Sequence, residues 1–332
     1  MEKPSLDTAK AGAMRFNTDS SQMEIYDGNQ WTGILATSPE LQTGGTRGLI
    51  MGGITSGRTN LVNFITIQTT GNTADFGDLV QTASQGAGLG SRTRAIAGGG
   101  TPSSPGGTNN IDFATISSTG NFADFGDFIT TGFARVAVSN STRGVFFGRA
   151  IAPGSYNTIE FITIAATGNS LDFGDLTAAR HTGGAAGNAT RGIAVGGSPS
   201  QGTMDFVTIS TTGNAADFGD CTVNIWNTRG GNCGNAVRGL MAGGEPGSSS
   251  AIQFVTIPSL GNTVDFGDRT VAKSQISHMS STTRGVFAGA GEGDSDVIDY
   301  VHIMSTGNAV DFGNLSEDYG YAAGASNGHG GL

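Results

Sequence analysis

The sequence predicts an all-β protein in which one unit is repeated six times. A Gly-Asn pair returns at intervals of 49, 48, 45, 48 and 46 residues, an Asp-Phe-Gly follows each pair, and a Thr-Arg-Gly or similar run precedes it. A period of this length and regularity is typical of repeat architectures. The six pairs begin at Gly71, Gly120, Gly168, Gly213, Gly261 and Gly307.

Each unit contains four strand signals. Residues 159–164 are rich in β-branched and aromatic residues, and Gly168-Asn169 separates them from a short run that ends at Asp175, which indicates a hairpin. Upstream of each hairpin lies an apolar run bounded by glycines, as at residues 190–197, preceded by a stretch of small residues, as at 183–187. Four short antiparallel strands per unit, without a helix, match one blade of a β-propeller, so six hairpins predict six blades.

The two ends of the repeat region complement each other. The first unit begins at residues 46–48 and lacks its small-residue strand, whereas residues 319–325 supply such a strand after the last Asp-Phe-Gly. We predict that this C-terminal strand pairs with residues 46–53 and closes the first blade, because the pairing removes two open sheet edges.

A resemblance follows from these motifs. The unit resembles a kelch repeat in three features: a double glycine at the end of one strand, an aromatic residue in the next, and Arg180 before a small-residue strand. It differs in that Phe mostly stands where kelch repeats have Tyr, and the Phe of Asp-Phe-Gly stands where they have Trp. The whole unit is similar to kelch-like arrays in structural proteins of tailed bacteriophages, notably cyanophages, over residues 46–332. The double glycines are Gly52-Gly53, Gly98-Gly99, Gly196-Gly197 and Gly243-Gly244.

Residues 1–45 differ in kind from the repeats. Two strand-like runs, 13–18 and 23–28, flank a turn and predict a small β-hairpin module followed by a linker. The module resembles hairpins near the ends of phage tail-fibre proteins. A hairpin of this size is marginal alone, so we expect it either to pack on the propeller or to serve as an attachment or oligomerisation element. The candidate attachment residues are Phe16, Tyr26 and Trp31.

Composition narrows the function classes. A formal net charge of −10 over 332 residues argues against a nucleic-acid surface, which is normally basic. Cys221 and Cys233 are too far apart for a Cys-x-x-Cys motif, and the four histidines are scattered; we therefore expect a buried thiol at Cys221, no metal site and no cofactor. We also expect no signal peptide and no membrane insertion, because no apolar run is long enough.

The connections between the second and third strands vary most among the units. They should gather on one face of the ring, where variable loops on a rigid scaffold commonly recognise partners; the alternative is that they drift without constraint. These loops span residues 54–61, 101–110, 151–158, 198–203, 245–250 and 292–296. The candidate binding residues are Arg58, Asn60, Pro102, Tyr156, Trp226 from the neighbouring passage 225–234, Glu245, Glu292 and Asp294.

The repeated Asp-Phe-Gly has a structural explanation. Its Phe should point into the core between blades, its Gly should permit a tight bend, and its Asp should form an ion pair with the Arg of Thr-Arg-Gly, giving a ladder of six. The arginines are Arg47, Arg94, Arg143, Arg191, Arg238 and Arg284, and the aspartates are Asp75, Asp124, Asp172, Asp217, Asp265 and Asp311.

Motifs for catalysis or metal binding are weaker. The kinase magnesium loop also contains Asp-Phe-Gly, but its lysine and catalytic loop are missing. Glu292, Asp294 and Asp296 have a spacing that suits calcium, yet the EF-hand order is absent. The sialidase box and a repeated Ser/His/Asp set are also missing. We therefore predict a protein that is not an enzyme; a carboxylate pair on one face, as in glycan-cleaving enzymes, stays as an alternative.

The resemblance implies a virion protein made in the host cytoplasm. The expected role is a tail-fibre or tail-associated component that recognises the host through a surface glycan or protein at the loop face. Residues 1–45 would bind other virion proteins or further copies of the chain. The alternatives are a capsid-decorating or architectural protein without a host ligand, and a glycan-degrading propeller enzyme.

Overall fold

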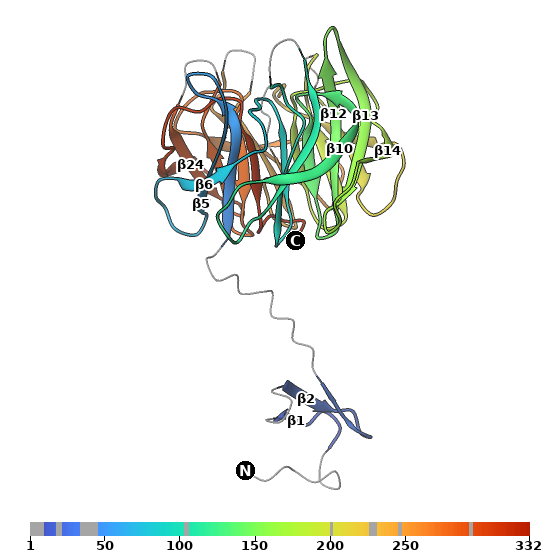
Figure 1. The fold of residues 1–332 in the computed structure, drawn as a ribbon. Coiled ribbons are helices and arrows are strands. Elements are labelled where there is room, and N and C mark those ends of the chain that lie inside the picture. The colour runs from blue at the N-terminus through green and yellow to red at the C-terminus, as the bar shows by residue number, and fades with distance from the viewer. Residues whose placement is uncertain are drawn as a thin grey trace. The chain divides into compact units, whose positions relative to one another are not determined.

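The computed structural model describes residues 10–17, 22–33, 46–102, 106–199, 202–225, 231–244, 248–291 and 295–332. The described residues form β-strands and no α-helix (Figure 1). The chain divides into two units, residues 1–43 and residues 44–332, and the second contains all six repeats.

The first unit is a three-stranded antiparallel sheet. Its strands are β1 (Met14–Asn17), β2 (Gln22–Tyr26) and β3 (Trp31–Gly33), in the order β1-β2-β3. Met14 lies opposite Ile25, and Tyr26 lies opposite Trp31. The sequence predicted the first two strands; the third forms because Asp27 Oδ1 accepts hydrogen bonds from the backbone N–H groups of Asn29 and Gln30, each at 2.8 Å, which reverses the chain.

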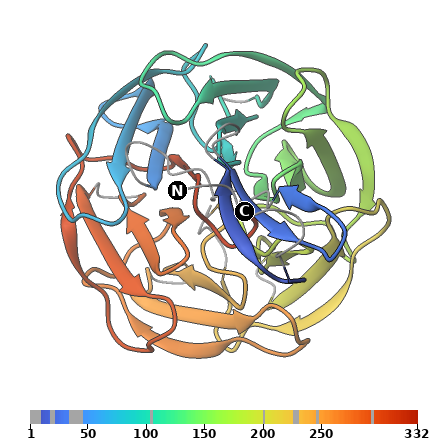
Figure 2. The ribbon, with the colours of Figure 1, turned by 90° about the horizontal axis from the view of Figure 1, so that it is seen from below.

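The second unit consists of six small antiparallel sheets around a common centre (Figure 2). We call them blades 1 to 6. Blade 1 contains β26 (Ala323–Ser326), β4 (Arg47–Ile54), β5 (Arg58–Thr66) and β6 (Ala74–Asp78). Blade 2 contains β7 (Ala87–Gly90), β8 (Arg94–Gly98), β9 (Thr108–Thr115) and β10 (Ala123–Gly132). Blade 3 contains β11 (Val136–Ser139), β12 (Arg143–Ile151), β13 (Gly154–Thr163) and β14 (Leu171–Asp175).

The remaining blades repeat this order. Blade 4 contains β15 (Gly184–Gly187), β16 (Arg191–Val195), β17 (Thr203–Thr208) and β18 (Ala216–Asp220). Blade 5 contains β19 (Arg238–Ala242), β20 (Ala251–Thr256) and β21 (Val264–Asp268). Blade 6 contains β22 (Ser277–Ser280), β23 (Arg284–Ala288), β24 (Val297–His302) and β25 (Val310–Asn314).

The predicted pairing of the C-terminal strand with the first repeat is confirmed. Strand β26 lies antiparallel to β4, with Ala323 opposite Met51 and Ser326 opposite Gly48. The first blade is therefore built from both ends of the repeat region, and its innermost edge is covered.

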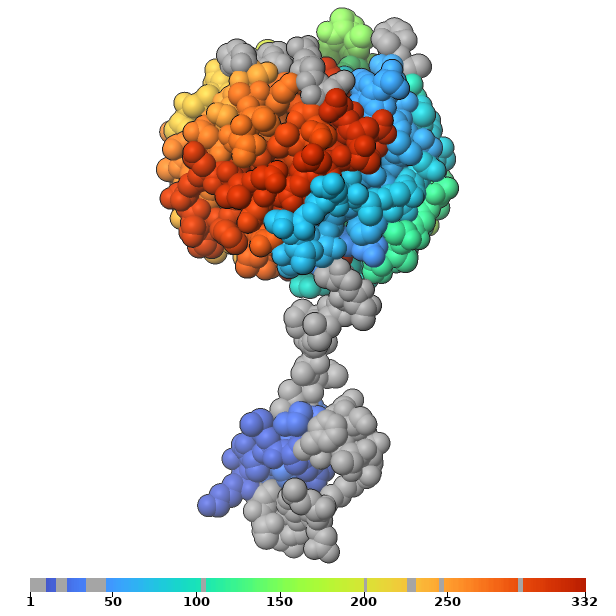
Figure 3. Space-filling view, turned by 90° about the vertical axis from the view of Figure 1, so that its left-hand side faces the viewer, coloured from blue at the N-terminus to red at the C-terminus, as the bar shows by residue number. Residues whose placement is uncertain are grey.

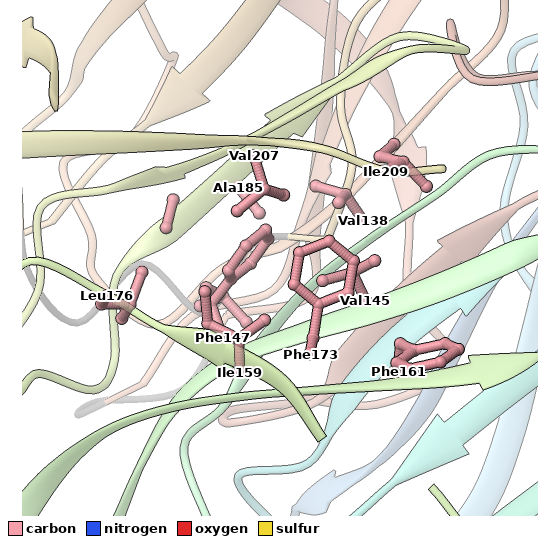
Figure 4. Packing of buried hydrophobic residues seen from close by; sticks show 12 residues of the cluster. Val138, Val145, Phe147, Ile159, Phe161, Phe173, Leu176, Ala185, Val207 and Ile209 are labelled. Carbon is pink, nitrogen blue, oxygen red and sulfur yellow. The ribbon is translucent and has the colours of Figure 1, made fainter. Parts of the chain in front are cut away.

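The apolar core lies between neighbouring blades. The Phe of every Asp-Phe-Gly is buried, as predicted, and Phe173 packs against Phe161 with ring centroids 5.9 Å apart at 80°. Around this pair, Val138 and Phe147 of blade 3 meet Ala185 and side chains of β17 from blade 4 (Figure 4). Edge-to-face packing of this kind adds to the burial of apolar area, so each blade is stabilised mainly by its neighbours.

The Gly-Asn pair joins one blade to the one before it. Gly120 N donates to Phe76 O at 2.7 Å, and Asn121 Oδ1 accepts from Asp78 N at 3.1 Å. A Cβ on Gly77, whose φ is +144°, would lie 2.5 Å from Gly120 O, which explains the Gly of Asp-Phe-Gly. The same bonds join blade 6 to blade 1, since Asn314 N donates to Asn72 Oδ1 at 3.0 Å.

Three regions depart from the predicted unit. In blade 5 the expected innermost strand is reduced, within the described residues, to a single bridge between Gly234 and Gly239. The expected loop 54–61 is largely strand, because β5 begins at Arg58, and the expected loop 151–158 is largely strand, because β13 begins at Gly154. Blades 1 and 3 thus carry long hairpins where loops were predicted.

Candidate functional site

The connections between second and third strands lie on one face of the second unit, which we call the loop face. The opposite side, where first and second strands connect, is the turn face. On the loop face, the β12–β13 hairpin of blade 3 projects at the top of Figure 1. Tyr156 on this hairpin keeps 37% of its surface exposed, and the Arg149 guanidinium lies 3.8 Å from the centre of its ring.

Arg149 marks the point at which blade 3 differs from the repeat. It follows Gly148, whose φ is +58°, and so takes the second place of the double glycine. In blades 1 and 4 that place is held by Gly53 and Gly197, where a Cβ would come within 2.8 Å of a backbone oxygen. In blade 3 the strand continues past Arg149 to Ile151, and in blade 1 it continues past Gly53 to Ile54. The sequence interpretation missed Arg149, although the broken double glycine was visible.

Polar groups surround the Arg149–Tyr156 pair. Arg149 is 8% exposed, and its Nη1 donates to Thr131 O of blade 2 at 3.1 Å. Ser155, next to Tyr156, lies with its Oγ 2.9 Å from Nδ1 of His181, which comes from the connection between blades 3 and 4. Ser155 and Tyr156 are consecutive strand residues, so their side chains point to opposite faces of the hairpin: the Arg149–Tyr156 pair lies toward blade 2 and the Ser155–His181 pair toward the connection to blade 4. The Arg149–Tyr156 pair is the part that can stack on a ligand and hydrogen-bond to it.

The other predicted loop residues have different positions. Arg58 Nε donates to Ser84 Oγ at 3.3 Å, and Asn60 Nδ2 donates to Leu79 O at 3.5 Å. Both side chains are half-buried, as is Pro102, so these residues serve the loop structure. The structure does not bring them together with Tyr156. Four predicted residues lie outside the described part of the chain: Trp226, Glu245, Glu292 and Asp294.

Strained backbone lines the loop-face end of the innermost strands. Five residues other than glycine at equivalent positions have φ between +57° and +65°: Gln85, Ala134, Thr182, Gln275 and Tyr321. Three backbone bonds link them from blade to blade, since Gln85 N donates to Tyr321 O, Ala134 N to Gln85 O and Thr182 N to Ala134 O, at 2.8 to 2.9 Å. Such a conformation costs about 1 kcal/mol or more per residue, so neighbouring contacts must hold it.

The six repeated arginines have partners other than those predicted. Each guanidinium lies over the third-strand aromatic ring of its own blade, 4.5 to 4.7 Å from the centroid, and its Nη1 donates to a carbonyl of the following blade at 2.7 to 3.2 Å. Arg191, for example, covers Phe206 and donates to Ile257 O. We call this set the arginine ladder; it lies on the turn face.

The arginine ladder replaces the predicted ion pairs. Within the described residues, no ion pair joins a ladder arginine to an Asp-Phe-Gly aspartate. These aspartates are exposed, because they alternate along the strand with a Phe that points inward. The carboxylates therefore form an acidic belt around the outer strands instead of neutralising the arginines.

Buried polar residues of the third strands form a second ladder, on the loop-face side of the blades. Each receives contacts from the segment that leaves the preceding blade, so we call them clasp residues: Asn63, Asp112, Glu160, Asp205, Gln253 and Asp299. Three of them form buried ion pairs, Glu160 with Arg135, Asp205 with Arg180 and Asp299 with Arg269, at 3.5, 2.9 and 3.0 Å. Sequence reasoning missed this ladder, although a polar residue interrupts every third-strand run.

Asp112 is the clasp carboxylate without a cationic partner among the described residues. Val80 N donates to its Oδ2 at 3.3 Å, while its Oδ1 is buried without a hydrogen bond. Burial, with a smaller contribution from the negative charge of Asp124, raises the pKa of Asp112 to about 6.

The turn-face end of the centre is filled by the C-terminal segment. His329 is 1% exposed; its Nε2 lies 2.9 Å from Gly90 O and 3.1 Å from Ser139 Oγ, and its Nδ1 lies 2.9 Å from Asn232 Nδ2. These partners belong to three different blades. Burial lowers the pKa of His329 to about 4, so the imidazole is neutral at pH 7 and acts as an internal cross-connection.

The attachment residues of the first unit are arranged differently from the prediction. Tyr26 and Trp31 pack on each other with centroids 5.4 Å apart, and Arg15 lies 4.2 Å above the Trp31 ring. Tyr26 and Arg15 therefore cover the Trp31 ring within the sheet, while Trp31 Nε1 is buried without a hydrogen-bond partner among the described residues. The exposed apolar residues are Met14, Met23 and Ile25, at 65%, 40% and 37%. The side chain of Phe16 lies outside the described residues.

Groups suited to other chemistry are few among the described residues. In the described ranges, His, Cys, Asp and Glu do not gather in threes that could hold a metal ion. Cys221 and Cys233 are buried free thiols, as predicted for Cys221, and burial raises the pKa of each to about 12. None of the described segments is a helix long and apolar enough to cross a membrane.

Comparison with known proteins does not assign the chain. No protein-family model matches it, and a search of the curated proteins finds no match.

Proposed function

We propose that the six blades form a closed, kelch-like, six-bladed β-propeller. Blade 6 is joined to blade 1 by the same contacts that join every other pair: Gly71 N donates to Phe312 O at 2.8 Å, and Arg284 Nη1 donates to Ile67 O at 3.1 Å. The shared first blade supports closure as well, because β26 and β4 come from opposite ends of the repeat region. A closed ring leaves no interior sheet edge for aggregation.

The propeller serves as a binding scaffold in the particle of a tailed bacteriophage, and its loop face recognises a host-surface glycan. The observation that carries this proposal is blade 3, where a long hairpin, Arg149 and Tyr156 replace the double glycine of the repeat. An exposed aromatic ring beside hydrogen-bonding side chains suits a sugar, whose C–H face stacks on the ring while its hydroxyls bond to polar groups. The proposed role is non-enzymatic.

Binding to an array of bacterial envelope glycans tests the loop face. Tyr156→Ala removes the ring, and Arg149→Gly restores the double glycine of blades 1, 2, 4 and 5. We expect either change to weaken binding about tenfold or more, because stacking and charge-assisted contacts contribute roughly 1 to 2 kcal/mol each. Leu171→Ala, an exposed position on the outer strand of blade 3, is the control and should bind normally. Equal binding by all four proteins would overturn the assignment.

Immunogold labelling of intact phage, with antibody against residues 46–332, tests the place in the particle. Label at tail tips or fibres agrees with host recognition. Label spread over the capsid would instead favour a decorating protein without a host ligand. Release of reducing sugar from envelope glycan during the binding assay would contradict the non-enzymatic role and favour a glycan-degrading propeller.

A further inference from the structure

The Arg149 guanidinium on the loop face lacks a counter-ion. Its side chain is 8% exposed, and among the described residues no carboxylate forms an ion pair with it. Glu160 of the same blade pairs with Arg135 at 3.5 Å and also accepts hydrogen bonds from the hydroxyls of Thr130 and Ser170, each at 2.5 Å. Arg149 therefore carries a positive charge that the protein leaves uncompensated, although a buried charge is normally paired.

Arg149 and Arg135 lie close together. Both pack against Gly132 of blade 2, where a Cβ would lie 3.1 Å from Cδ of Arg149 and 3.3 Å from Nη1 of Arg135. Burial lowers the pKa of Arg135 to about 10, the charge of Glu160 opposes this, and the positive charge of Arg149 adds to it. Two guanidinium groups thus share one carboxylate, which leaves one positive charge in excess at this place.

One nitrogen of the Arg149 guanidinium is open to a ligand. Nη1 donates to Thr131 O at 3.1 Å, and Nε is buried without a hydrogen bond. Nη2 has no hydrogen bond to the described residues and does not belong to their buried, unpaired atoms, so it is exposed to solvent. The Tyr156 ring beside it keeps 37% of its surface exposed, and the hairpin that carries both residues projects from the loop face, in light green in Figure 3. A free cationic donor and a free ring are therefore neighbours.

The surrounding loops do not repel an anion. The segment 176–183, which leads from blade 3 to blade 4, contains Arg180 and His181 but no acidic residue. The connections between second and third strands in blades 5 and 6 contain the acidic residues Glu245, Glu292, Asp294 and Asp296. The corresponding connections in blades 1 to 4 contain none: 54–61, 101–110, 151–158 and 198–203. Although the net charge of the protein is −10, blade 3 thus offers a local excess of positive charge.

We propose, building on the glycan recognition proposed above, that the ligand of the loop face is an acidic glycan. Its sugar ring packs on the exposed part of Tyr156, and its anionic substituent, a carboxylate or a phosphate, is held by Arg149. A guanidinium forms charge-assisted hydrogen bonds with either anion, and these are stronger than bonds between neutral groups. The anion also supplies the negative charge that Arg149 lacks within the protein. A neutral glycan gains only the stacking and the weaker bonds.

The test compares each glycan with its own neutralised form. The array of bacterial envelope glycans is printed as isolated, with carboxyl groups converted to methyl esters, and with phosphate groups removed. The full chain should bind acidic glycans about fivefold to tenfold more tightly than one of the two neutralised forms, because the charge-assisted bond is lost there. Loss on esterification identifies a carboxylate, and loss on removal of phosphate identifies a phosphate. Added salt should weaken binding of the acidic form more than that of the neutralised form.

Variants assign the preference to Arg149. Arg149→Gln should bind the acidic and neutralised forms equally, and its binding of the neutralised form at the wild-type level shows that the hairpin is intact. Arg149→Lys keeps the charge and should retain part of the preference. Tyr156→Ala should weaken binding of both forms alike. Arg58→Gln, which removes the loop-face arginine of blade 1, is the matched control and should keep the wild-type preference.

The outcomes separate this inference from the proposed function. Binding that is equal for all three forms would overturn the acidic ligand while glycan recognition stands. Binding to none of the forms would overturn glycan recognition itself and the acidic ligand with it. A preference for acidic glycans that persists in Arg149→Gln would overturn the assignment of the anion to Arg149.

Discussion

The turn face and the loop face of the blades are built from the same six units but differ in how strictly they repeat. On the turn face, every ladder arginine has the same two partners, an aromatic ring of its own blade and a carbonyl of the next. On the loop-face side, the clasp residue is a carboxylate in four blades and an amide in two, and, among the described residues, three of the four carboxylates have an arginine partner. The repeat thus fixes the turn face and leaves the loop face free to differ.

The physical reason lies in what each ladder bonds to. The arginine ladder uses backbone carbonyls, which every residue provides, so its geometry does not depend on the neighbour's side chains. A clasp ion pair needs two side chains that match, and one changed partner leaves a buried charge. Variation on the loop-face side therefore has a cost unless both members change together, and blade 2 bears that cost by raising the pKa of its unpaired Asp112.

The largest effect should come from breaking a clasp ion pair. Asp205→Ala leaves the buried Arg180 guanidinium without its carboxylate at 2.9 Å, and we expect a loss of about 3 to 5 kcal/mol in the free energy of unfolding by urea. The matched control is the double change Asp205→Asn with Arg180→Tyr, which copies the bond between Asn63 and Tyr319 of blades 1 and 6. The double variant should be more stable than Asp205→Ala. If the double variant lost as much unfolding free energy as the sum of its two single changes, or more, the clasp would not be a matched pair.

A smaller but uniform effect should come from the arginine ladder. Arg191→Ala removes a cation–π contact at 4.7 Å and a hydrogen bond at 2.7 Å, for a loss of roughly 1 to 3 kcal/mol. Arg238→Ala should cost a similar amount, because its contacts to Phe254 and Ile303 are of the same kind. Urea unfolding of both variants checks this. If Arg191→Ala and Arg238→Ala lost very different amounts of unfolding free energy, the conclusion that the turn face repeats more strictly than the loop face would be wrong.

An effect of opposite sign, which depends on pH, concerns the unpaired clasp. The folded-state pKa of Asp112 is raised to about 6 from 3.8, so its protonated form favours folding below about pH 4 and that contribution is lost as pH rises through 6. Asp112→Asn should therefore stabilise the protein by up to about 3 kcal/mol at pH 7 to 8, and by close to nothing at pH 4, because a shift of about two pKa units corresponds to about 3 kcal/mol. Unfolding curves at both pH values test this; the same gain at both would rule out titration of Asp112.

The sequence predicted the repeat far better than the contacts between repeats. The burial of Phe173 and its equivalents and the pairing of β26 with β4 followed from position in the repeat alone. The partners of the ladder arginines did not follow from position, because a guanidinium can pair with a carboxylate, lie over an aromatic ring or donate to a backbone carbonyl. The choice depends on which groups the next blade places within reach.

The candidate site was predicted in part. Tyr156 was named from a variable loop and does lie on the loop face, yet its partner Arg149 was overlooked, because their contact depends on the pairing of β12 with β13 beyond the expected end of the strand. The sequence also suggested that Trp31 needs an external partner, whereas Tyr26 and Arg15 cover it within the same sheet.

By itself, the sequence determined the number of units, their strand content and the residues that face the core, because these depend on local spacing and side-chain period. The tertiary structure alone decided which side chains meet across blades. His329, near the end of the chain, illustrates the difference: it bonds to groups of blades 2, 3 and 5, residues separated from it by 239, 190 and 97 positions. No local pattern encodes such contacts, since they exist only once the ring has brought six distant segments to one centre.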